Sequence, residues 1–230
     1  MTVYATICTR SREDVTATTD KLLSFLAQCD VKVCLISGAR SIFEAYEGAY
    51  AHINPNPEDI LIFCHDDIEI HHSPEEFLNI LKENLDSDEV GFIGPAGTTY
   101  LSPNAIWWDH QLWQQGKHRG RVFHYDKHGQ VHNTVYGPPD DVVVLDGLFL
   151  ATKPKVIENI SLQKPEYFVG DWDYYDINLT SQAFLKGYTN KAIALNILHN
   201  SRGEIAGKAG WELNRAAFIA NTELPMQIFK

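Results

Sequence analysis

The stretch Glu58–His71, EDILIFCHDDIEIH, decides the fold of this chain. Its first half, Ile60–Cys64, is a continuous apolar run rich in β-branched and aromatic residues, which is typical of a strand buried on both faces of a sheet. The run ends abruptly at His65–Glu69, so the strand delivers acidic side chains at its carboxyl end. Open α/β sheets bind their ligands at that edge. The stretch therefore predicts an α/β fold with a ligand crevice beside residues 65–69.

Asp66 and Asp67 are the neighbouring carboxylates at this edge. They repel each other unless a positive group offsets them. A divalent cation is the usual partner, because hard cations take oxygen ligands. A turn that caps the next helix is the alternative, since Asp-Asp after a strand also serves that purpose. The local sequence thus indicates a metal at the edge of the crevice, with the turn as the competing interpretation.

Length and charge limit the class of protein. A chain of 230 residues with 44% apolar residues and a net charge of −11 fits one large acidic domain. The only basic cluster is His118–Arg121, so we expect no nucleic-acid partner. Four scattered cysteines without a CxxC pair indicate free thiols, and no apolar run reaches membrane-spanning length. We therefore expect a cytoplasmic protein with no integral membrane segment.

The first 96 residues alternate strands and helices. Strands are expected over 2–8, 31–36, 60–64 and 90–93, and helices over 11–27, 41–52 and 73–85. Helix-start signals lie at Ser11 with Asp14, at Ser41 and at Ser73. This order predicts a mostly parallel sheet with helices on both faces, like the Rossmann-type half of a nucleotide-binding domain. Neither GxGxxG nor GxxxxGK[ST] is present, which disfavours dinucleotide and P-loop binding.

Residues 97–230 follow a different pattern. Aromatic residues, including Trp107, Trp108 and Trp113, gather in the irregular segment 97–137, and a hairpin tip is expected at 126–129. Their faces suit sugar rings, but they equally suit a second small core. Further on we expect a strand over 142–145 that ends at Asp146–Gly147 and is continued by 148–151. We also expect a helix from about residue 175 to Gly187, a strand over 192–198 and a helix over 211–220. We interpret the chain as one domain, with a nucleotide-binding half at 1–96 and an acceptor-binding half at 97–230.

Several motifs in this order resemble the family 2 glycosyltransferases of the GT-A fold, in particular their short bacterial and viral-type forms. The motifs are Cys64–Glu69, similar to the DxD region; Val144–Ala151, similar to a G-x-F-L-A strand; Tyr175–Leu179, similar to an E-D-x-D-L segment; and His199, Ser201 and Gly203, similar to H-x-S-x-G. The resemblance covers nearly the whole chain. It implies a GT-A-like three-layer α/β/α sandwich with a mostly parallel central sheet.

The resemblance also implies roles for individual residues. Asp176 would be the catalytic base and Asp146 would position the acceptor hydroxyl, although each is also a plausible turn or helix-start residue. Asp67 and His199 would hold Mn²⁺ or Mg²⁺. The donor would contact Thr6, Thr9, Arg10, Arg40 and Asp66, and the acceptor would contact Trp107, Trp108 and Asp173. Arg10, Arg40 and Arg202 are phosphate candidates that are otherwise ordinary surface arginines.

Three departures from the family pattern stand out. His65 replaces the first aspartate of DxD, Tyr175 replaces the glutamate before Asp176, and Asn178 replaces the second aspartate of E-D-x-D-L. The Q-x-x-R-W motif of processive synthases is not present. We therefore expect transfer of one sugar residue rather than polymerisation.

The resulting hypothesis is a metal-dependent, hexosyltransferase-like enzyme. It would move one sugar from a nucleotide-diphosphate sugar, with a UDP-sugar favoured, to a glycan or lipid-linked sugar acceptor, inverting the anomeric centre. Two alternatives stay open. A sugar-phosphate nucleotidyltransferase would need a glycine-rich loop after the first strand, and Thr9–Arg12 contains no glycine. A non-catalytic glycan- or nucleotide-binding module is conceivable because the DxD region is degenerate.

Overall fold

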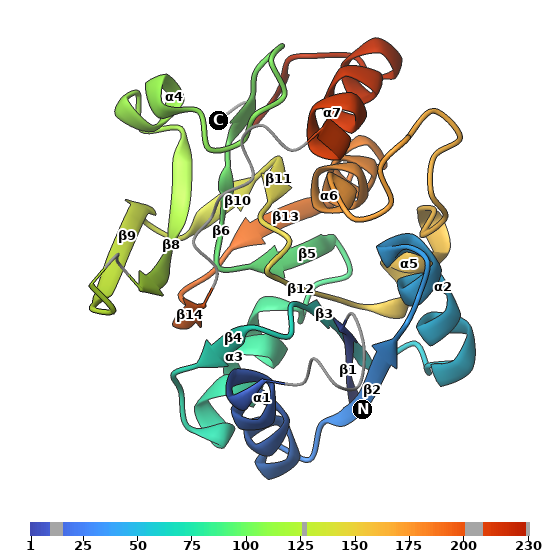
Figure 1. Cartoon of the computed structure of the whole chain (residues 1–230), viewed down its shortest axis with the longest axis vertical. Coiled ribbons are helices and arrows are strands. Elements are labelled where there is room, and N and C mark those ends of the chain that lie inside the picture. Colours follow the sequence, from blue (N-terminus) through green and yellow to red (C-terminus); the bar gives the residue numbers. More distant parts are fainter. Residues whose placement is uncertain (10–15, 126–127, 201–208, 229–230) are drawn as a thin grey trace.

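The computed structural model describes residues 1–9, 16–125, 128–200 and 209–228, which form two main sheets with flanking helices (Figure 1). The larger sheet has seven strands in the order β10-β13-β5-β12-β3-β1-β2. Their bounds are β1 Val3–Thr9, β2 Lys32–Ser37, β3 Ile60–Cys64, β5 Val90–Gly94, β10 Asp140–Val142, β12 Phe149–Thr152 and β13 Thr189–Ala192.

Most strands of the larger sheet run the same way, as the sequence predicted. β1 pairs in parallel with β2 and β3, and β13 pairs in parallel with β5. β12 runs antiparallel between β3 and β5, and β10 runs antiparallel to β13. β3 is buried along its whole length, which explains why its sequence is apolar without alternation. Strands from both halves of the chain therefore share one sheet.

Helices cover both faces of this sheet (Figure 1). Their bounds are α1 Ala17–Gln28, α2 Ile42–Ile53, α3 Pro74–Asn84, α4 His110–Gln114, α5 Pro154–Asn159, α6 Tyr175–Leu185 and α7 Ala209–Asn221. Phe149 of β12 lies opposite Cys64 and packs on Phe77 of α3, whereas Phe63 packs on Tyr46 of α2. Because successive strand residues face opposite sides, α3 and α2 lie on opposite faces. The three-layer arrangement is confirmed.

Capping residues set the helix starts. Ser41 accepts a hydrogen bond from the Glu44 amide at the start of α2, and Ser73 and Glu76 form a capping box at the start of α3, both as predicted. The first helix differs, because Thr16 caps α1 and the helix begins at Ala17. The expected signals at Ser11 and Asp14 lie outside the described residues.

A second sheet has the order β11-β6-β8-β14-β4, with β9 paired to β8. Its strands are β4 Ile68–Ile70, β6 Ala96–Thr98, β8 His118–Tyr125, β9 Val131–Gly137, β11 Val144–Leu145 and β14 Ile197–His199; β7 Tyr100–Leu101 pairs separately with β15 Met226–Gln227. The antiparallel pairing of β8 and β9 confirms the expected hairpin around residues 126–129.

The strands expected over 142–151 and 192–198 are corrected by this sheet. The first divides into the end of β10, β11 and β12, and the second into β13 and β14, so each expected strand crosses from one sheet to the other. The crossings lie at Val143, over 146–148 and over 193–196. The apolar sequence on both sides of each crossing hid them, because residues buried between two sheets are as apolar as residues inside one.

All four cysteines are free; Cys29 and Cys64 are buried, and Cys8 and Cys34 are half-buried. None of the helices in the described part of the chain has the length and apolar character needed to cross a membrane.

Candidate active site

A cavity of about 910 Å³ opens where β1 and β3 end. Cys8 and Thr9 of β1 and the residues that follow β3 line one side of it. The turn between β11 and β12, the start of α6, the end of β14 and an aromatic segment also line it. Residues from distant parts of the chain thus meet at the sheet edge where the sequence placed a ligand crevice.

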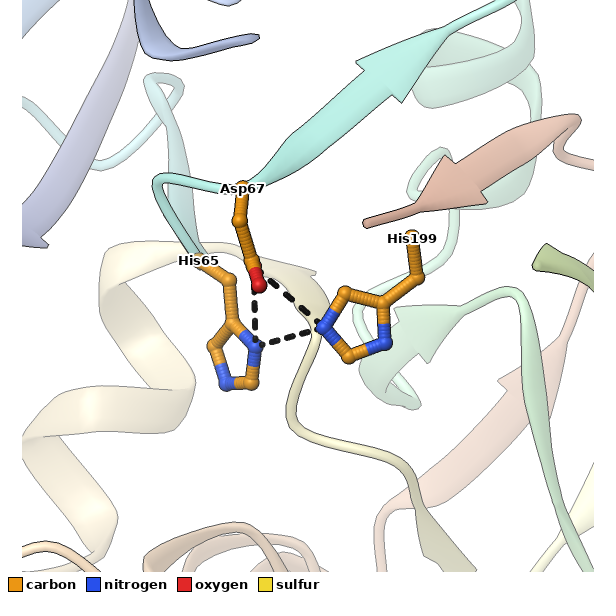
Figure 2. A group of neighbouring side chains, drawn as sticks. All are labelled: His65, Asp67 and His199. Carbon is orange, nitrogen blue, oxygen red and sulfur yellow. Dashed lines mark hydrogen bonds and ion pairs between the residues drawn. The ribbon is translucent and has the colours of Figure 1, made fainter. Parts of the chain in front are cut away.

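Three side chains in this cavity form a compact group of metal-binding type (Figure 2). The carboxylate Oδ1 of Asp67 lies 3.3 Å from Nε2 of His199 and 3.7 Å from Nδ1 of His65. The two ring nitrogens lie 3.3 Å from each other. His65 and Asp67 belong to the loop between β3 and β4, and His199 ends β14, which pairs with β4. The pairing of β14 with β4 is what brings His199 to the acidic loop.

The protonation states of this group follow from its surroundings. Burial lowers the pKa of His65 to about 4, and the nearby His199 adds to this effect. Burial by itself would also lower the pKa of His199, but the hydrogen bond and charge of Asp67 raise it above the ordinary value. His65 is therefore neutral near pH 7, and Asp67 favours the protonated form of His199. Neutral imidazole and ionised carboxylate are the forms that bind metals.

The turn Asp146–Gly147 connects this group to α6. The Tyr175 hydroxyl lies 2.8 Å from Nε2 of His65 and donates a hydrogen bond of 3.0 Å to the Gly147 carbonyl. The Gly147 amide in turn donates to Oδ2 of Asp176 at 3.0 Å. Gly147 is therefore hydrogen-bonded both to the Tyr175 hydroxyl and to the Asp176 carboxylate, at the start of α6.

Asp146 and Asp176 are carboxyl groups with raised pKa values. Burial raises the pKa of Asp146. Burial and then the charge of Asp146 raise the pKa of Asp176 to about 7. A carboxyl group with such a pKa takes up a proton effectively at neutral pH, which is the property of a general base.

Gly147 leaves no room for a larger residue. A Cβ built there would lie 2.6 Å from the Tyr175 hydroxyl and 2.7 Å from Cβ of Asp176. We expect Gly147→Ala to lower the free energy of unfolding by about 1–3 kcal/mol, because buried groups must move apart. Urea denaturation will measure this. Gly48→Ala in α2, where a Cβ meets nothing within 4 Å, is the control and should be neutral or slightly stabilising. Equal stability of the two variants would contradict the close packing.

An aromatic wall forms the far side of the cavity. All five tryptophans of the chain line it: Trp107, Trp108, Trp113, Trp172 and Trp211. Trp107, Trp108, Trp113 and Trp211 form a continuous series of ring contacts with Tyr136. The centroid separations are 5.6 Å for Trp113–Tyr136, 5.4 Å for Tyr136–Trp107, 5.8 Å for Trp107–Trp108 and 5.3 Å for Trp108–Trp211. Trp107 and Trp211 are buried and anchor the wall, while Trp113 and Trp172 are exposed.

Most site residues named from the sequence meet in this cavity. Those that line it are Thr9, Asp66, Asp67, Trp107, Trp108, Asp146, Asp173, Asp176 and His199. Arg10, Ser201, Arg202 and Gly203 lie outside the described residues. Two predictions need correction. Thr6 is buried within β1 and does not line the cavity, and Arg40 is exposed and paired with Glu44 at 2.8 Å on α2. Arg40 precedes the N-cap Ser41, and Glu44 in the first turn of α2 accepts hydrogen bonds from both the backbone amide and the guanidinium of Arg40.

The sequence did not single out His65, Tyr175, Trp172 and Trp211 as site residues. His65 and Tyr175 were noted only as departures from a pattern, although the departures themselves were the available signal. Trp172 precedes Asp173 and Trp211 lies in α7, and nothing local distinguishes them from core residues.

Comparison with known proteins agrees with this architecture. StrF, a streptomycin biosynthesis protein of Streptomyces griseus, is 30% identical over 130 residues, which cover 56% of this chain and 42% of StrF. The chain thus spans less than half of that relative.

Two solved structures have a similar fold. Protein A197 from STIV is 16% identical with a TM-score of 0.51, covering 87% of this chain and 86% of A197. GalNAc-T7, crystallised with UDP, GalNAc and Mn²⁺, is 11% identical with a TM-score of 0.56, covering 96% of this chain and 48% of GalNAc-T7. The GT-A-like fold is confirmed. Residues 10–196 match the family described as "Glycosyltransferase like family", and the chain therefore belongs to that family.

Proposed function

We propose that this domain transfers one sugar from a nucleotide-diphosphate sugar to an acceptor hydroxyl, with a divalent metal at His65, Asp67 and His199. The observation that carries the proposal is that this metal-type group and Asp176, a carboxyl group of pKa about 7, line the same cavity. A transferase of this kind needs both, because charge must be neutralised on the departing diphosphate and a proton must leave the attacking hydroxyl.

The donor set fits a transition-metal ion. Two imidazole nitrogens and one carboxylate oxygen lie within 4.8 Å of one another. Mg²⁺ prefers oxygen ligands and retains its waters, so the nitrogens favour a transition metal, and we propose Mn²⁺. Bound there, the ion would supply positive charge for the diphosphate. Such charge is needed, because no lysine or arginine is among the described residues that line the cavity.

Asp176 is the proposed base. Its Oδ2 accepts a hydrogen bond from the Gly147 amide, which fixes the carboxylate while the rest of the group faces the cavity. Direct attack by a hydroxyl deprotonated in this way would invert the anomeric centre. Asp146, whose Oδ1 accepts a hydrogen bond from the Leu148 amide, is proposed to orient the acceptor.

The partners are proposed from the shape and chemistry of the lining. GalNAc-T7 was crystallised with UDP, and we propose a UDP-sugar as the donor here, with its nucleotide near Thr9 and Asp66. The aromatic wall suits the apolar face of a sugar ring, so the acceptor is proposed to be a glycan or a lipid-linked sugar placed against Trp108 and Trp172, near Asp173.

Thermal denaturation with UDP, GDP and CMP, each with Mn²⁺, Mg²⁺ or a chelator, tests the proposal. We expect UDP to stabilise the protein with Mn²⁺ and to lose most of this effect with chelator, because the diphosphate binds through the metal. Hydrolysis of UDP-sugars, followed by release of UDP, then tests turnover. Stabilisation without any turnover would favour a binding module. No stabilisation by any nucleotide with any metal would contradict the proposal.

A further inference from the structure

Two departures from the family pattern are in direct contact. His65 and Tyr175 are 110 residues apart in the chain, yet Nε2 of His65 lies 2.8 Å from the Tyr175 hydroxyl. Tyr175 is 6% exposed and is the first residue of α6, which places it next to Asp176. Its ring packs edge-on against Tyr46, with centroids 5.7 Å apart. The phenol is therefore held in place by packing as well as by hydrogen bonds.

The hydrogen bonds around this phenol determine where His65 carries its proton. A tyrosine hydroxyl has one hydrogen, and the Gly147 carbonyl, 3.0 Å away, can only accept. Both contacts are satisfied together only when the Tyr175 hydrogen lies on Gly147 and the Tyr175 oxygen accepts. At 2.8 Å the ring nitrogen of His65 must then be the donor, so Nε2 carries the hydrogen. In a neutral imidazole, Nδ1 is consequently a bare lone pair.

That lone pair faces the proposed metal position. Nδ1 is the atom of His65 that lies 3.3 Å from Nε2 of His199 and 3.7 Å from Oδ1 of Asp67 (Figure 2). We propose that Tyr175 is a positioning residue that fixes His65 as its Nε2–H tautomer and so presents Nδ1 as the third metal ligand. This inference rests on the metal site of the proposed function. The tyrosine does for the histidine what partners of metal-bound imidazoles do in other sites, namely orient the ring and choose the tautomer.

The first test reads the tautomer without metal. In the metal-free protein labelled with ¹⁵N-histidine, long-range ¹H–¹⁵N correlations distinguish a ring nitrogen that bears hydrogen from one that does not. His65→Gln assigns the signal among the ten histidines. We expect hydrogen on Nε2 in the wild type and a mixture of tautomers in Tyr175→Phe. Hydrogen on Nδ1 in the wild type, or an unchanged spectrum in Tyr175→Phe, overturns the inference.

The second test measures Mn²⁺ affinity by isothermal titration calorimetry. Tyr175→Phe should weaken binding about 10–100-fold, as loss of an outer partner of a metal ligand does. Tyr174→Phe is the matched control, because that neighbouring buried hydroxyl donates instead to the Ala105 carbonyl. It should bind Mn²⁺ as the wild type does.

A double variant separates positioning from general damage. If Tyr175 acts through His65, Tyr175→Phe should change Mn²⁺ affinity less than twofold when His65→Asp is already present. An equal loss in both backgrounds, or an equal loss in Tyr174→Phe, overturns the positioning role. Absence of Mn²⁺ binding in the wild type would instead overturn the metal dependence in the proposed function, and the tautomer measurement would still decide what Tyr175 does to His65.

Discussion

Asp176→Asn should lower sugar transfer by about 10²–10⁴-fold, the usual contribution of a general base. Asparagine has nearly the same shape, and its oxygen can still accept the hydrogen bond that the Gly147 amide gives to Asp176. The loss should therefore appear in kcat with donor binding retained. Initial rates of UDP release with and without acceptor will measure it.

The pH profile gives an independent check on the same residue. Because the pKa of Asp176 is about 7, the fraction of the carboxylate form rises tenfold per pH unit below 7 and levels off above it. kcat/KM of the wild type should follow that rise. The residual activity of Asp176→Asn should lack it. A profile that rises through pH 7 equally in both proteins would assign the proton to another group.

The same substitution should stabilise the protein above neutral pH. The folded-state pKa of Asp176 is raised above its unfolded value of about 4. The protonated carboxyl therefore contributes stability that is fully present below pH 4 and is lost as the pH rises through 7. Asparagine does not ionise, so the variant does not lose stability in this way. We expect the free energy of unfolding of the variant to exceed that of the wild type by about 1–3 kcal/mol at pH 8 and to equal it at pH 4. The expected gain is smaller than the full pKa shift would give, because the carboxylate contacts water in the cavity. Urea unfolding at the two pH values measures the difference, and a variant less stable than wild type at pH 8 would contradict it.

Asp67→Asn should remove metal-dependent nucleotide binding. Asp67 is the one carboxylate in the group that lies within reach of both His65 and His199, so its loss leaves two neutral nitrogens and no anionic ligand. We expect Mn²⁺ affinity to fall by at least about 100-fold, and the stabilisation by UDP with Mn²⁺ to approach the value seen with chelator.

A matched substitution controls for the general effect of losing one negative charge. Asp88→Asn removes the same charge from an exposed residue that pairs with Lys155 at 3.1 Å and is not among the described residues that line the cavity. Asp88→Asn should bind Mn²⁺ and UDP as the wild type does. If Asp67→Asn binds Mn²⁺ as tightly as the wild type, the metal does not bind at His65, Asp67 and His199. The proposed way of holding the diphosphate would then be wrong.

The sequence predicted the parts of this molecule that depend on local patterns. β3 could be read from Ile60–Cys64 because burial on both faces demands an unbroken apolar run, and α2 and α3 could be read from Ser41 and Ser73 because capping is local. The ligand edge after β3 followed from the same run.

What failed depends on pairings distant in the chain. The sequence of Phe149–Thr152 does not indicate that this strand runs antiparallel between β3 and β5, because contacts with both neighbouring strands determine its direction. The pairing of His65 with Tyr175 was likewise invisible, because a hydrogen bond across 110 positions leaves no spacing signal. Arg40 shows the opposite error, because this candidate for binding a distant ligand is paired with Glu44, only four positions along the chain.

The position of β12 bears on how the chain can fold as it leaves the ribosome. β5 contacts the larger sheet only through β12 and β13, which the chain supplies after residue 148. Until then a nascent chain can assemble β1, β2 and β3, but the edge of β3 stays open and β5 has nowhere to dock. An open, apolar strand edge invites association with other chains. Completion of β12 is therefore the step that both closes this vulnerable edge and creates the turn on which the cavity is built.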